Sequence, residues 1–578
     1  MPPPAPRRPA AHAWIFCACL LAAACGGDGD GGGDIRLDVI VRGGTLYDGS
    51  GDGPRVADVG IAGDTIAAIG DLSGSTAPSE VDATGMAVAP GFINVLSWAT
   101  ESLLEDPRGL SDIVQGVTLE VFGEGWSMGP LTDEMRAEQI AQQGDITYEI
   151  PWTTLGEYLD HLAERGISPN VASFVGATTV RIHELGEEDR APSDDELARM
   201  QELVRAAMRE GALGVGSSLI YAPAFYADTD ELVALAAAAG EYGGSYITHM
   251  RSEGGRLLEA VEETMEIGRR AGVPVEIYHL KAAGRANWPK MDTVIARIDS
   301  ARAAGAHVRA DMYTYVAGAT GLDAAMPPWV QEGGHDAWVE RLRDPTTRAR
   351  VAREMRTPTD DWENLLLMAG TPERVLLVGF RQDSLKYLTG RSLAEVAIQR
   401  GTSPEETAID LVIADDSRVG TIYFLMSEDN VRKQIEQPWV SFGSDAGAPA
   451  PEGVFLRSNP HPRAYGNFAR LLGRYVREEG VIPLEEAIRR LTSLPAENLQ
   501  LRDRGRLAPG FHADVVVFDP ATITDRATFE EPHALAEGVR DVWVNGVRVL
   551  EGGAHTGALP GRVVRGPGWE GWAEGLDQ

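Results

Sequence analysis

Four side chains that can bind a metal or transfer a proton each stand where a short apolar segment of the sequence ends: Glu124, His249, His279 and Asp445. Two imidazoles and one carboxylate form a ligand set that zinc accepts, and three protein ligands leave one position open for water. A second carboxylate beside such a site can accept a proton from that water. The pattern therefore predicts a divalent metal of the zinc type, held by Glu124, His249 and His279, with Asp445 as the catalytic acid and base.

Each of these residues also has an ordinary structural explanation. A single histidine at a strand end is often a hydrogen-bonded structural residue, and Glu124 stands in a glycine-rich turn at 123–125. Asp445 could simply cap a turn. Metal ligation is favoured because His249 and His279 fall at the same height on consecutive predicted strands. The Gly-Ser-Asp sequence that ends in Asp445 follows an apolar strand, which favours a catalytic role for this carboxylate.

The elements that must position these residues are short apolar strands alternating with amphipathic helices. Helical spacing marks the segments 229–242, 254–271 and 292–304. The alternation is typical of an α/β fold in which eight parallel strands close into a TIM-like (β/α)8 barrel. In that fold, catalytic residues gather at the carboxyl ends of the strands. The eight predicted strands are 88–96, 117–122, 170–177, 213–221, 245–251, 274–281, 307–315 and 439–445.

Short β-segments with glycine and aspartate turns occur at both ends of the chain. This pattern predicts a small composite β-sandwich built from 37–89 and 503–565, with an Asn-Gly hairpin signal at 545–546. Residues 90–502 then form the barrel, which is longer than the typical length of about 250 residues and must contain insertions. The largest predicted insertion is 316–438, which contains charged helical stretches at 335–356 and could form a lid or a small subdomain over the barrel mouth. Residues 566–578 are a C-terminal tail.

Composition excludes several classes of protein. The 578 residues include 52 Lys and Arg against 86 Asp and Glu, a net charge of −34, which repels nucleic acid phosphates and makes a DNA or RNA partner improbable. A 43% share of hydrophobic residues excludes a disordered chain. The three cysteines are Cys17, Cys19 and Cys25, so the body of the protein has no disulfide, thiol nucleophile or thiolate ligand.

The first residues have the form of an export signal. An apolar run at 13–24 follows Arg7 and Arg8 and is shorter than the roughly 20 residues of a membrane span. The sequence 21–26 resembles a bacterial lipobox, which predicts a signal peptide at 1–24, lipidation of Cys25 and a Gly/Asp-rich tether at 25–36. We therefore expect an exported lipoprotein in the periplasm or at the outer membrane. Simple cleavage and a twin-arginine signal are the alternatives.

Several motifs resemble those of the amidohydrolase superfamily, and within it the D-aminoacylase (N-acyl-D-amino-acid deacylase) family. The resemblance implies a composite β-sandwich and a metal-dependent barrel that hydrolyses the amide of N-acylated D-amino acids. It also implies that Lys281 contacts the substrate carboxylate and that Tyr221 and Tyr315 lie near the substrate, with Arg251 as a further binding candidate. The motifs are DVIVRGGTLYDGSG at 38–51, APGFI at 89–93, THMRSE at 248–253, DMYTYVAGATGL at 311–322, GSD at 443–445 and HPRAYG at 461–466.

The sequence departs from the family pattern at half of the usual metal site. Members carry a His-x-His pair after the Pro-Gly-Phe-Ile segment, where this chain has Leu96 and Trp98. The family's cysteine ligand is replaced by Glu124, whose carboxylate can also bind zinc. The family's Gly-His-Gly-Thr loop reads Gly-Ala-Thr-Thr at 176–179. The resemblance thus implies one zinc per chain, with water as the nucleophile and Asp445 passing its proton to the leaving amine.

Three other functions remain open from the sequence. Residues 125–129 spell the G-x-S-x-G elbow of serine hydrolases around Ser127, although the flanking glycines and Pro130 disrupt the required strand-turn-helix context. A degenerate barrel could bind acylated amino acids without turnover. A dipeptide or a cyclic amide could replace the acyl amino acid as substrate. The sequence does not determine the oligomeric state.

Overall fold

The computed structural model describes residues 36–574 of the chain. The predicted signal peptide, the lipidation site at Cys25 and nearly all of the predicted tether lie outside these residues. Leu37 onward forms one compact unit. Within the described range, no helix combines the length and the apolar character needed to cross a bilayer.

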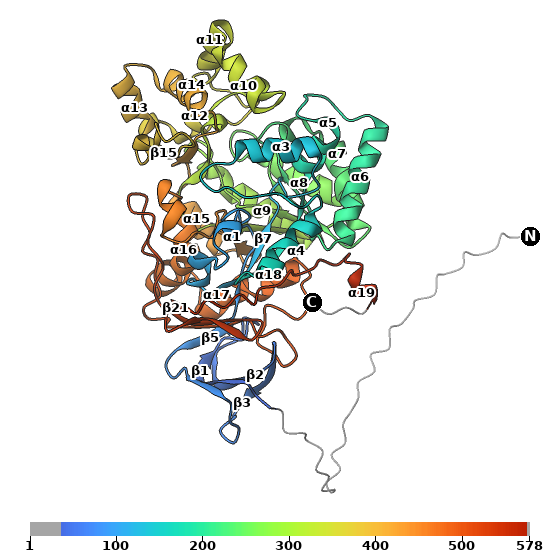
Figure 1. Ribbon diagram of the computed structural model, residues 1–578, viewed down its shortest axis with the longest axis vertical. Coiled ribbons are helices and arrows are strands. Elements are labelled where there is room, and N and C mark those ends of the chain that lie inside the picture. Colours follow the sequence, from blue (N-terminus) through green and yellow to red (C-terminus); the bar gives the residue numbers. More distant parts are fainter. Residues whose placement is uncertain (1–35, 575–578) are drawn as a thin grey trace, which may run out of the picture. The chain divides into compact units, whose positions relative to one another are not determined.

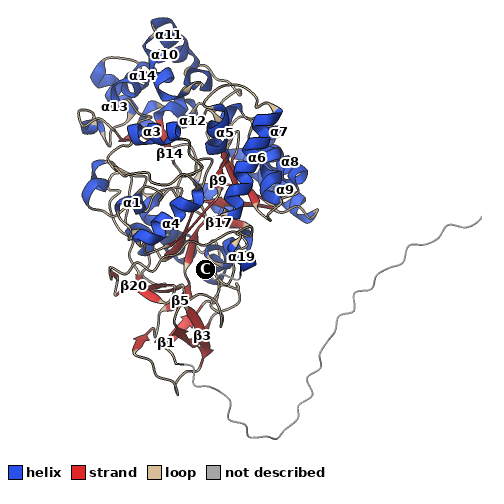
Figure 2. Ribbon diagram, turned by 45° about the vertical axis from the view of Figure 1, so that its right-hand side comes forward, coloured by secondary structure: helices blue, strands red, loops and turns tan. Residues whose placement is uncertain are grey.

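A barrel of eight parallel strands occupies the centre of this unit, and the predicted (β/α)8 fold is confirmed. Each predicted strand segment contains one barrel strand, the third being divided at Phe174. A bridge between Ser97 and Ala446 joins the first barrel strand to the last. Figure 2 shows the strands surrounded by helices. The barrel strands are β6 (Phe92–Asn94), β7 (Val117–Phe122), β8 (Asn170–Ser173) with β9 (Val175–Gly176), β10 (Gly214–Ser218), β11 (Ser245–His249), β12 (Val275–Ile277), β13 (Val308–Met312) and β17 (Val440–Phe442).

Amphipathic helices pack around the barrel with their apolar faces inward. Helix α8 (Leu257–Ala271) buries Leu257, Val261 and Ile267, which recur at helical spacing, and ends at Gly272 in the left-handed conformation. Capping boxes fix the starts of α4 and α6, where Thr154 and Ser193 accept hydrogen bonds from the backbone three residues later. The main helices are α4 (Leu155–Arg165), α6 (Asp194–Arg209), α7 (Thr229–Gly240), α8 and α9 (Met291–Ala303).

The two ends of the described chain meet in one nine-stranded sheet. Strand β5 pairs with β1 on one side and with β18 on the other, so it joins N-terminal and C-terminal strands. A bridge between Thr65 and His512 brings distant parts of the sheet together over an apolar core. The strands are β1 (Val39–Leu46), β2 (Arg55–Ala62), β3 (Thr65–Gly70), β4 (Ser79–Asp82), β5 (Ala87–Pro90), β18 (Val515–Phe518), β19 (Val539–Val544), β20 (Val547–Glu551) and β21 (Ala554–His555).

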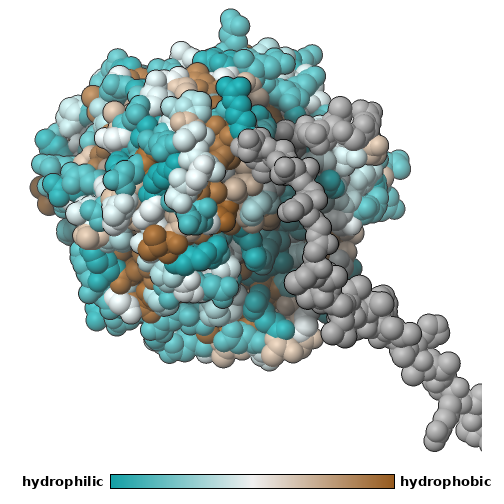
Figure 3. Space-filling model, turned by 90° about the horizontal axis from the view of Figure 1, so that it is seen from below, coloured by the Kyte–Doolittle hydropathy of each residue, from teal (hydrophilic) through white to brown (hydrophobic). Residues whose placement is uncertain are grey.

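This β-domain lies at one end of the barrel and the insertion lies at the other (Figure 1). Hydrophilic side chains cover most of the face seen from the β-domain side, and hydrophobic side chains form small separate groups there (Figure 3). Such a surface suits a strongly acidic protein in water.

The insertion between β13 and β17 has a core of its own. A three-stranded antiparallel sheet carries a layer of helices. The predicted helical stretches at 335–356 form two helices, which are separated where Asp344 caps the second and Pro345 begins it. The principal elements are β14 (Gly318–Gly321), α10 (Gly334–Arg343), α11 (Pro345–Glu354), α12 (Leu365–Ala369), β15 (Val375–Gly379), α13 (Leu393–Arg400), α14 (Pro404–Asp415) and β16 (Gly420–Tyr423).

Close backbone packing at the mouth of the barrel requires glycine in β10. A Cβ atom on Gly216 would lie 2.0 Å from the carbonyl oxygen of Gly123. We predict that Gly216→Ala lowers the free energy of unfolding by about 1–3 kcal/mol, because the loop 123–125 must move aside. Chemical denaturation tests this, with Gly53→Ala as the control, since nothing lies within 4 Å of a Cβ at Gly53. Equal stability of the two variants would contradict the packing argument.

Candidate metal centre

The four residues singled out by the sequence meet at the carboxyl end of the barrel. His249 is the last residue of β11, while Glu124 and His279 follow β7 and β12 by two residues and Asp445 follows β17 by three. The strands run parallel, so their carboxyl ends open onto the same edge. All four side chains line one cavity.

Two glycines give Glu124 its position. Gly123 adopts φ +109° and Gly125 adopts φ +74°, a backbone region that other residues rarely enter. A Cβ on Gly123 would lie 2.4 Å from the Phe174 carbonyl oxygen, and one on Gly125 would lie 2.7 Å from the Ser218 side chain. The loop can therefore pass close to its neighbours and direct the Glu124 carboxylate into the cavity.

Two of the other functional residues have strained backbones. His279 adopts φ +34° and Asp445 adopts φ +50°, although neither is a glycine. The surrounding structure holds both: His279 donates its backbone N–H to Asp311 Oδ1 at 2.8 Å, and Asp445 donates its own to the Leu96 carbonyl oxygen at 2.9 Å. Residues in such sparsely populated backbone conformations are concentrated at functional sites, where the surrounding structure holds the side chain in a required position despite the conformational energy.

Two imidazole nitrogens converge on one carboxylate oxygen. His249 Nδ1 lies 3.0 Å and His279 Nε2 lies 2.9 Å from Glu124 Oε1, and the two imidazole rings are 4.5 Å apart. All three residues are at most 5% exposed. The three ligand atoms lie within 4.8 Å of one another. Nitrogen and oxygen donors this close together fit a single divalent cation of the zinc type.

A second carboxylate, Glu253, lies on the side of the two imidazoles that faces away from Glu124. His279 Nδ1 lies 3.1 Å from Glu253 Oε1, and His249 Nε2, a buried nitrogen without a hydrogen-bond partner among the described residues, lies 3.7 Å from Glu253 Oε2. Lys281 Nζ binds both Glu253 Oε1 and His279 Nδ1 at 2.6 Å. Metal-ligating histidines commonly donate their outer N–H to such a carboxylate. Glu253 thus lies near the outer nitrogen of His279, whereas the outer nitrogen of His249 is beyond hydrogen-bond distance of it.

The charges of the cluster are strongly coupled. Burial alone would raise the pKa of Glu124, but the imidazoles of His279 and His249 lower it overall. Burial and Lys281 would lower the pKa of His279, yet the carboxylates of Glu124 and Glu253 raise it to about 10. The same two carboxylates would stabilise a bound cation.

Asp445 is held by two donors on opposite sides. The Trp98 indole N–H lies 3.2 Å from Asp445 Oδ1, and the guanidinium of the buried Arg463 lies 2.8 Å from Oδ2. Burial raises the pKa of Asp445, and the charge of Arg463 offsets this only in part. A carboxyl with a raised pKa is suited to accept a proton and return it.

The cavity above these residues has a volume of about 460 Å³ and receives walls from both the barrel and the insertion. The Tyr221 ring lies 5.4 Å from the His249 ring, and Lys281 lies 5.6 Å from the centre of the Tyr313 ring. Arg418 of the insertion pairs with Asp323 and lies 5.1 Å from the Tyr221 ring. Much of the remaining wall is apolar or aromatic: Trp126, Ile220, Leu365, Val378, Tyr423 and Leu425.

Two of the expected substrate-binding residues, Arg251 and Tyr315, do not line the metal-site cavity. Arg251 leaves the site because Glu263 of α8 and the carbonyl oxygens of Phe225 and Ala227 hold its guanidinium. Tyr315 turns toward Asp525 and the His461 ring. Tyr313, two residues earlier, lines the cavity instead. Lys281 and Tyr221 do lie at the cavity.

The serine-hydrolase alternative finds no support in the geometry. Ser127 Oγ donates to the Gly129 carbonyl oxygen at 2.6 Å and accepts the Gly176 N–H at 2.9 Å. In the described part of the chain, no imidazole or carboxylate hydrogen-bonds to this hydroxyl. Ser127 therefore fixes the loop after Glu124 and lacks the base that a serine nucleophile needs.

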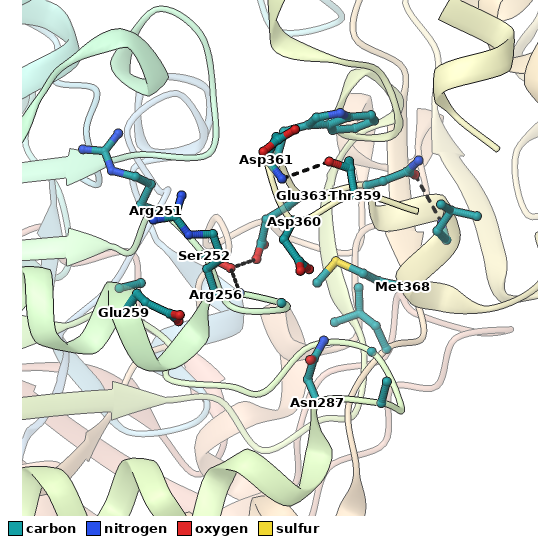
Figure 4. Close-up of a pocket in the computed structure, with 18 of the residues that line it drawn as sticks. Arg251, Ser252, Arg256, Glu259, Asn287, Thr359, Asp360, Asp361, Glu363 and Met368 are labelled. Atoms are coloured by element: carbon teal, nitrogen blue, oxygen red, sulfur yellow. Dashed lines mark hydrogen bonds between the residues drawn. The ribbon is translucent and has the colours of Figure 1, made fainter. Parts of the chain in front are cut away.

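A larger cavity of about 1230 Å³ lies beside the metal centre, between α8 and the insertion. Glu363 of the insertion meets the Ser252 hydroxyl at 2.7 Å in the wall of this cavity (Figure 4). The same carboxylate accepts the backbone N–H groups of Glu253 and Gly254. The insertion thereby clamps the loop that carries Glu253, the carboxylate behind the two imidazoles.

Sequence reasoning missed three residues of the centre: Trp98, Glu253 and Arg463. Glu253 stands four residues after His249 in the THMRSE motif, so its spacing from a ligand was the available signal. Arg463 belongs to the HPRAYG motif, where an arginine near a cluster of acids could have been suspected. Trp98 was visible only as a departure from the family pattern.

Comparisons with known proteins agree with this architecture. A family model described as "Amidohydrolase family" matches residues 79–550. D-aminoacylase of Alcaligenes xylosoxydans xylosoxydans is 36% identical over 532 residues, which cover 91% of this chain and 97% of that protein.

Two solved structures have the same overall arrangement. One is a D-aminoacylase, which matches with a TM-score of 0.76 at 34% identity over 92% of this chain and 100% of its own. That enzyme is described as having a binuclear metal centre with one-metal activation and second-metal attenuation. N-acyl-D-glutamate deacylase of Bordetella bronchiseptica, solved with zinc and a phosphonate mimic of the tetrahedral intermediate, matches with a TM-score of 0.76 at 31% identity and the same coverage.

Removal of either imidazole should abolish metal binding. We predict that His249→Ala and His279→Ala each lose the divalent metal that the wild-type chain retains through dialysis, because two protein ligands hold a cation far more weakly than three. Elemental analysis of the purified variants measures this. His183→Ala, a change on helix α5 (Ala177–Leu185) outside the cavity, is the control. Retention of stoichiometric metal by both ligand variants would refute the site.

Proposed function

The chain belongs to the amidohydrolase family, as its motifs indicate, and from this membership we propose that it is a zinc-dependent deacylase of N-acyl-D-amino acids. The observation that carries the proposal is the cluster of Glu124, His249 and His279, which faces Asp445 across one cavity. The deacylase relatives support the choice of substrate class.

We further propose that one zinc ion is held per chain, by Glu124, His249 and His279. Two observations support a single ion: Leu96 is buried in the apolar core, and the Trp98 indole lies between Glu124 and Asp445. A zinc ion bound there supplies a Lewis acid that polarises the amide carbonyl and makes water nucleophilic near neutral pH.

Asp445 performs the proton transfers in this proposal. Its carboxylate takes the proton of the attacking water and delivers it to the nitrogen of the departing amino acid. Trp98 and Arg463 hold the carboxylate from its two sides, so it keeps one orientation during both transfers. The amide bond breaks, and a carboxylic acid and a free amino acid leave the cavity.

Two cations in the cavity wall are suited to the substrate's α-carboxylate. Arg463 has a buried Nε without a hydrogen-bond partner among the described residues, and its guanidinium lies 4.4 Å from the Tyr313 ring centre. Lys281 donates to Glu253 at 2.6 Å and lines the same cavity, and its ammonium has three N–H groups in all. Because both cations are fixed by neighbours, a bound carboxylate would be oriented relative to Asp445.

We also propose that the enzyme is exported and anchored through a lipid on Cys25. The support is the sequence alone: an apolar run, a lipobox-like Leu-Ala-Ala-Ala-Cys-Gly at 21–26 and a Gly/Asp-rich segment after it. Membrane contact would then be limited to the N-terminal anchor.

Amine release from N-acetyl-D- and N-acetyl-L-amino acids tests the proposed activity. We expect turnover of D-substrates, its loss after chelation and its recovery with zinc, because the three-ligand site requires the cation. His249→Ala serves as the inactive control. Bound zinc without turnover of either series would indicate another amide, and the absence of both metal and turnover would indicate a non-catalytic binding protein.

Asp445→Asn tests the proton-transfer role separately from metal binding. The amide keeps the shape of the carboxylate and cannot accept the proton, so we predict that kcat falls by about 10²–10⁴-fold while the zinc content is unchanged. Steady-state kinetics and elemental analysis measure the two quantities on the same preparation. A near-normal kcat would remove Asp445 from the mechanism.

A further inference from the structure

One N–H group serves two carboxylates at the metal centre, the buried Glu124 and the partly buried Asp445. Trp98 Nε1 lies 3.0 Å from Glu124 Oε2 and 3.2 Å from Asp445 Oδ1. Oxygens from the ends of β7 and β17 therefore converge on a single neutral donor. Convergence of two carboxylates on one point normally calls for a cation, because their charges repel.

The oxygens of Glu124 and Asp445 are divided between different partners. Glu124 Oε1 faces the two imidazoles and Oε2 faces Trp98. Asp445 Oδ1 faces Trp98 and Oδ2 faces Arg463. A continuous chain of polar contacts thus runs from the imidazoles through Glu124, Trp98 and Asp445 to Arg463. Trp98 is its central link.

The backbone around Trp98 is fixed to the same segment as Asp445. The Leu96 carbonyl oxygen accepts the Asp445 N–H, and the Trp98 N–H donates to the Ala446 carbonyl oxygen, both at 2.9 Å. The Leu96 side chain is 1% exposed within the apolar core. Segment 96–98 is therefore fixed to segment 445–446 by backbone hydrogen bonds, and the Trp98 indole nitrogen faces the two carboxylates.

We propose that Trp98 is a positioning residue that ties Glu124 to Asp445 and occupies the place of a second cation. The indole nitrogen lies within hydrogen-bond distance of both oxygens, so a cation that bound both would have to displace it. Trp98 fixes the position of the two carboxylates relative to each other and adds no positive charge. The kinetic part of this inference rests on the proposed deacylase function, and the metal-binding part does not.

The first test counts metal ions. The full chain, dialysed against excess zinc and then against zinc-free buffer, is expected to retain one zinc. Trp98→His supplies an imidazole beside Glu124 and Asp445, and we expect this variant to retain two. Two zinc ions in the wild type, or one in both proteins, would overturn the proposal that the indole excludes a second cation.

The second test separates positioning from wall packing. Trp98→Phe keeps an aromatic ring in the cavity wall and removes the N–H donor. We expect kcat to fall at least tenfold while KM changes less than threefold and one zinc is retained. Trp362→Phe, outside the metal-site cavity, is the matched control. An unchanged kcat in Trp98→Phe would overturn the positioning role.

A third readout is independent of substrate. Addition of zinc to the metal-free protein should change the tryptophan fluorescence, because the Trp98 indole contacts the ligand Glu124. The change should persist in Trp362→Phe and shrink in Trp98→Phe; an equal change in both variants would count against the contact. If the wild type binds zinc but hydrolyses no N-acyl amino acid, the proposed function is wrong. The metal count and the fluorescence change would still show whether Trp98 contacts Glu124 and excludes a second cation.

Discussion

The burial of Glu124 at the closed end of a cavity is the constraint on which the rest of the site depends. A buried carboxylate must be matched by donors or cations on every side, and here two imidazoles take one oxygen and Trp98 takes the other. The strained backbones of His279 and Asp445, and the glycines around Glu124, follow from bringing these partners to one point. The barrel provides that point because the ends of its parallel strands converge.

Much of the fold and of the centre could be predicted from the sequence. Strand positions were predictable because buried parallel strands are short apolar runs, and the ligands could be placed because each follows such a run directly. The contact between Trp98 and Asp445 could not be predicted, because it joins residues 347 positions apart in the sequence. An indole is also a side chain that is seldom considered beside a metal site. The position of Arg251 outside the cavity could not be predicted, because its guanidinium binds Glu263 on the following helix and spacing from His249 does not reveal that ion pair.

The insertion is tied to the chemistry as well as to the cavity wall. Glu363 accepts hydrogen bonds from the loop at 252–254, and Glu253 in that loop contacts Lys281 and the two imidazoles. The Arg418 guanidinium, also from the insertion, lies over Tyr221, whose ring faces His249. A segment inserted between the seventh and eighth barrel strands thus helps to fix the orientation of ligands that belong to the second, fifth and sixth.

Charge balance favours a centre with one metal and an anionic substrate. Three carboxylates, the buried Glu124 and Glu253 and the partly buried Asp445, face two fixed cations, Lys281 and Arg463. With neutral imidazoles this set carries one net negative charge, and one divalent cation leaves one net positive charge. A substrate with one carboxylate would then neutralise the site, whereas a second divalent cation would leave two positive charges uncompensated in a low-dielectric cavity. The Trp98 indole is neutral and therefore leaves this charge count unchanged.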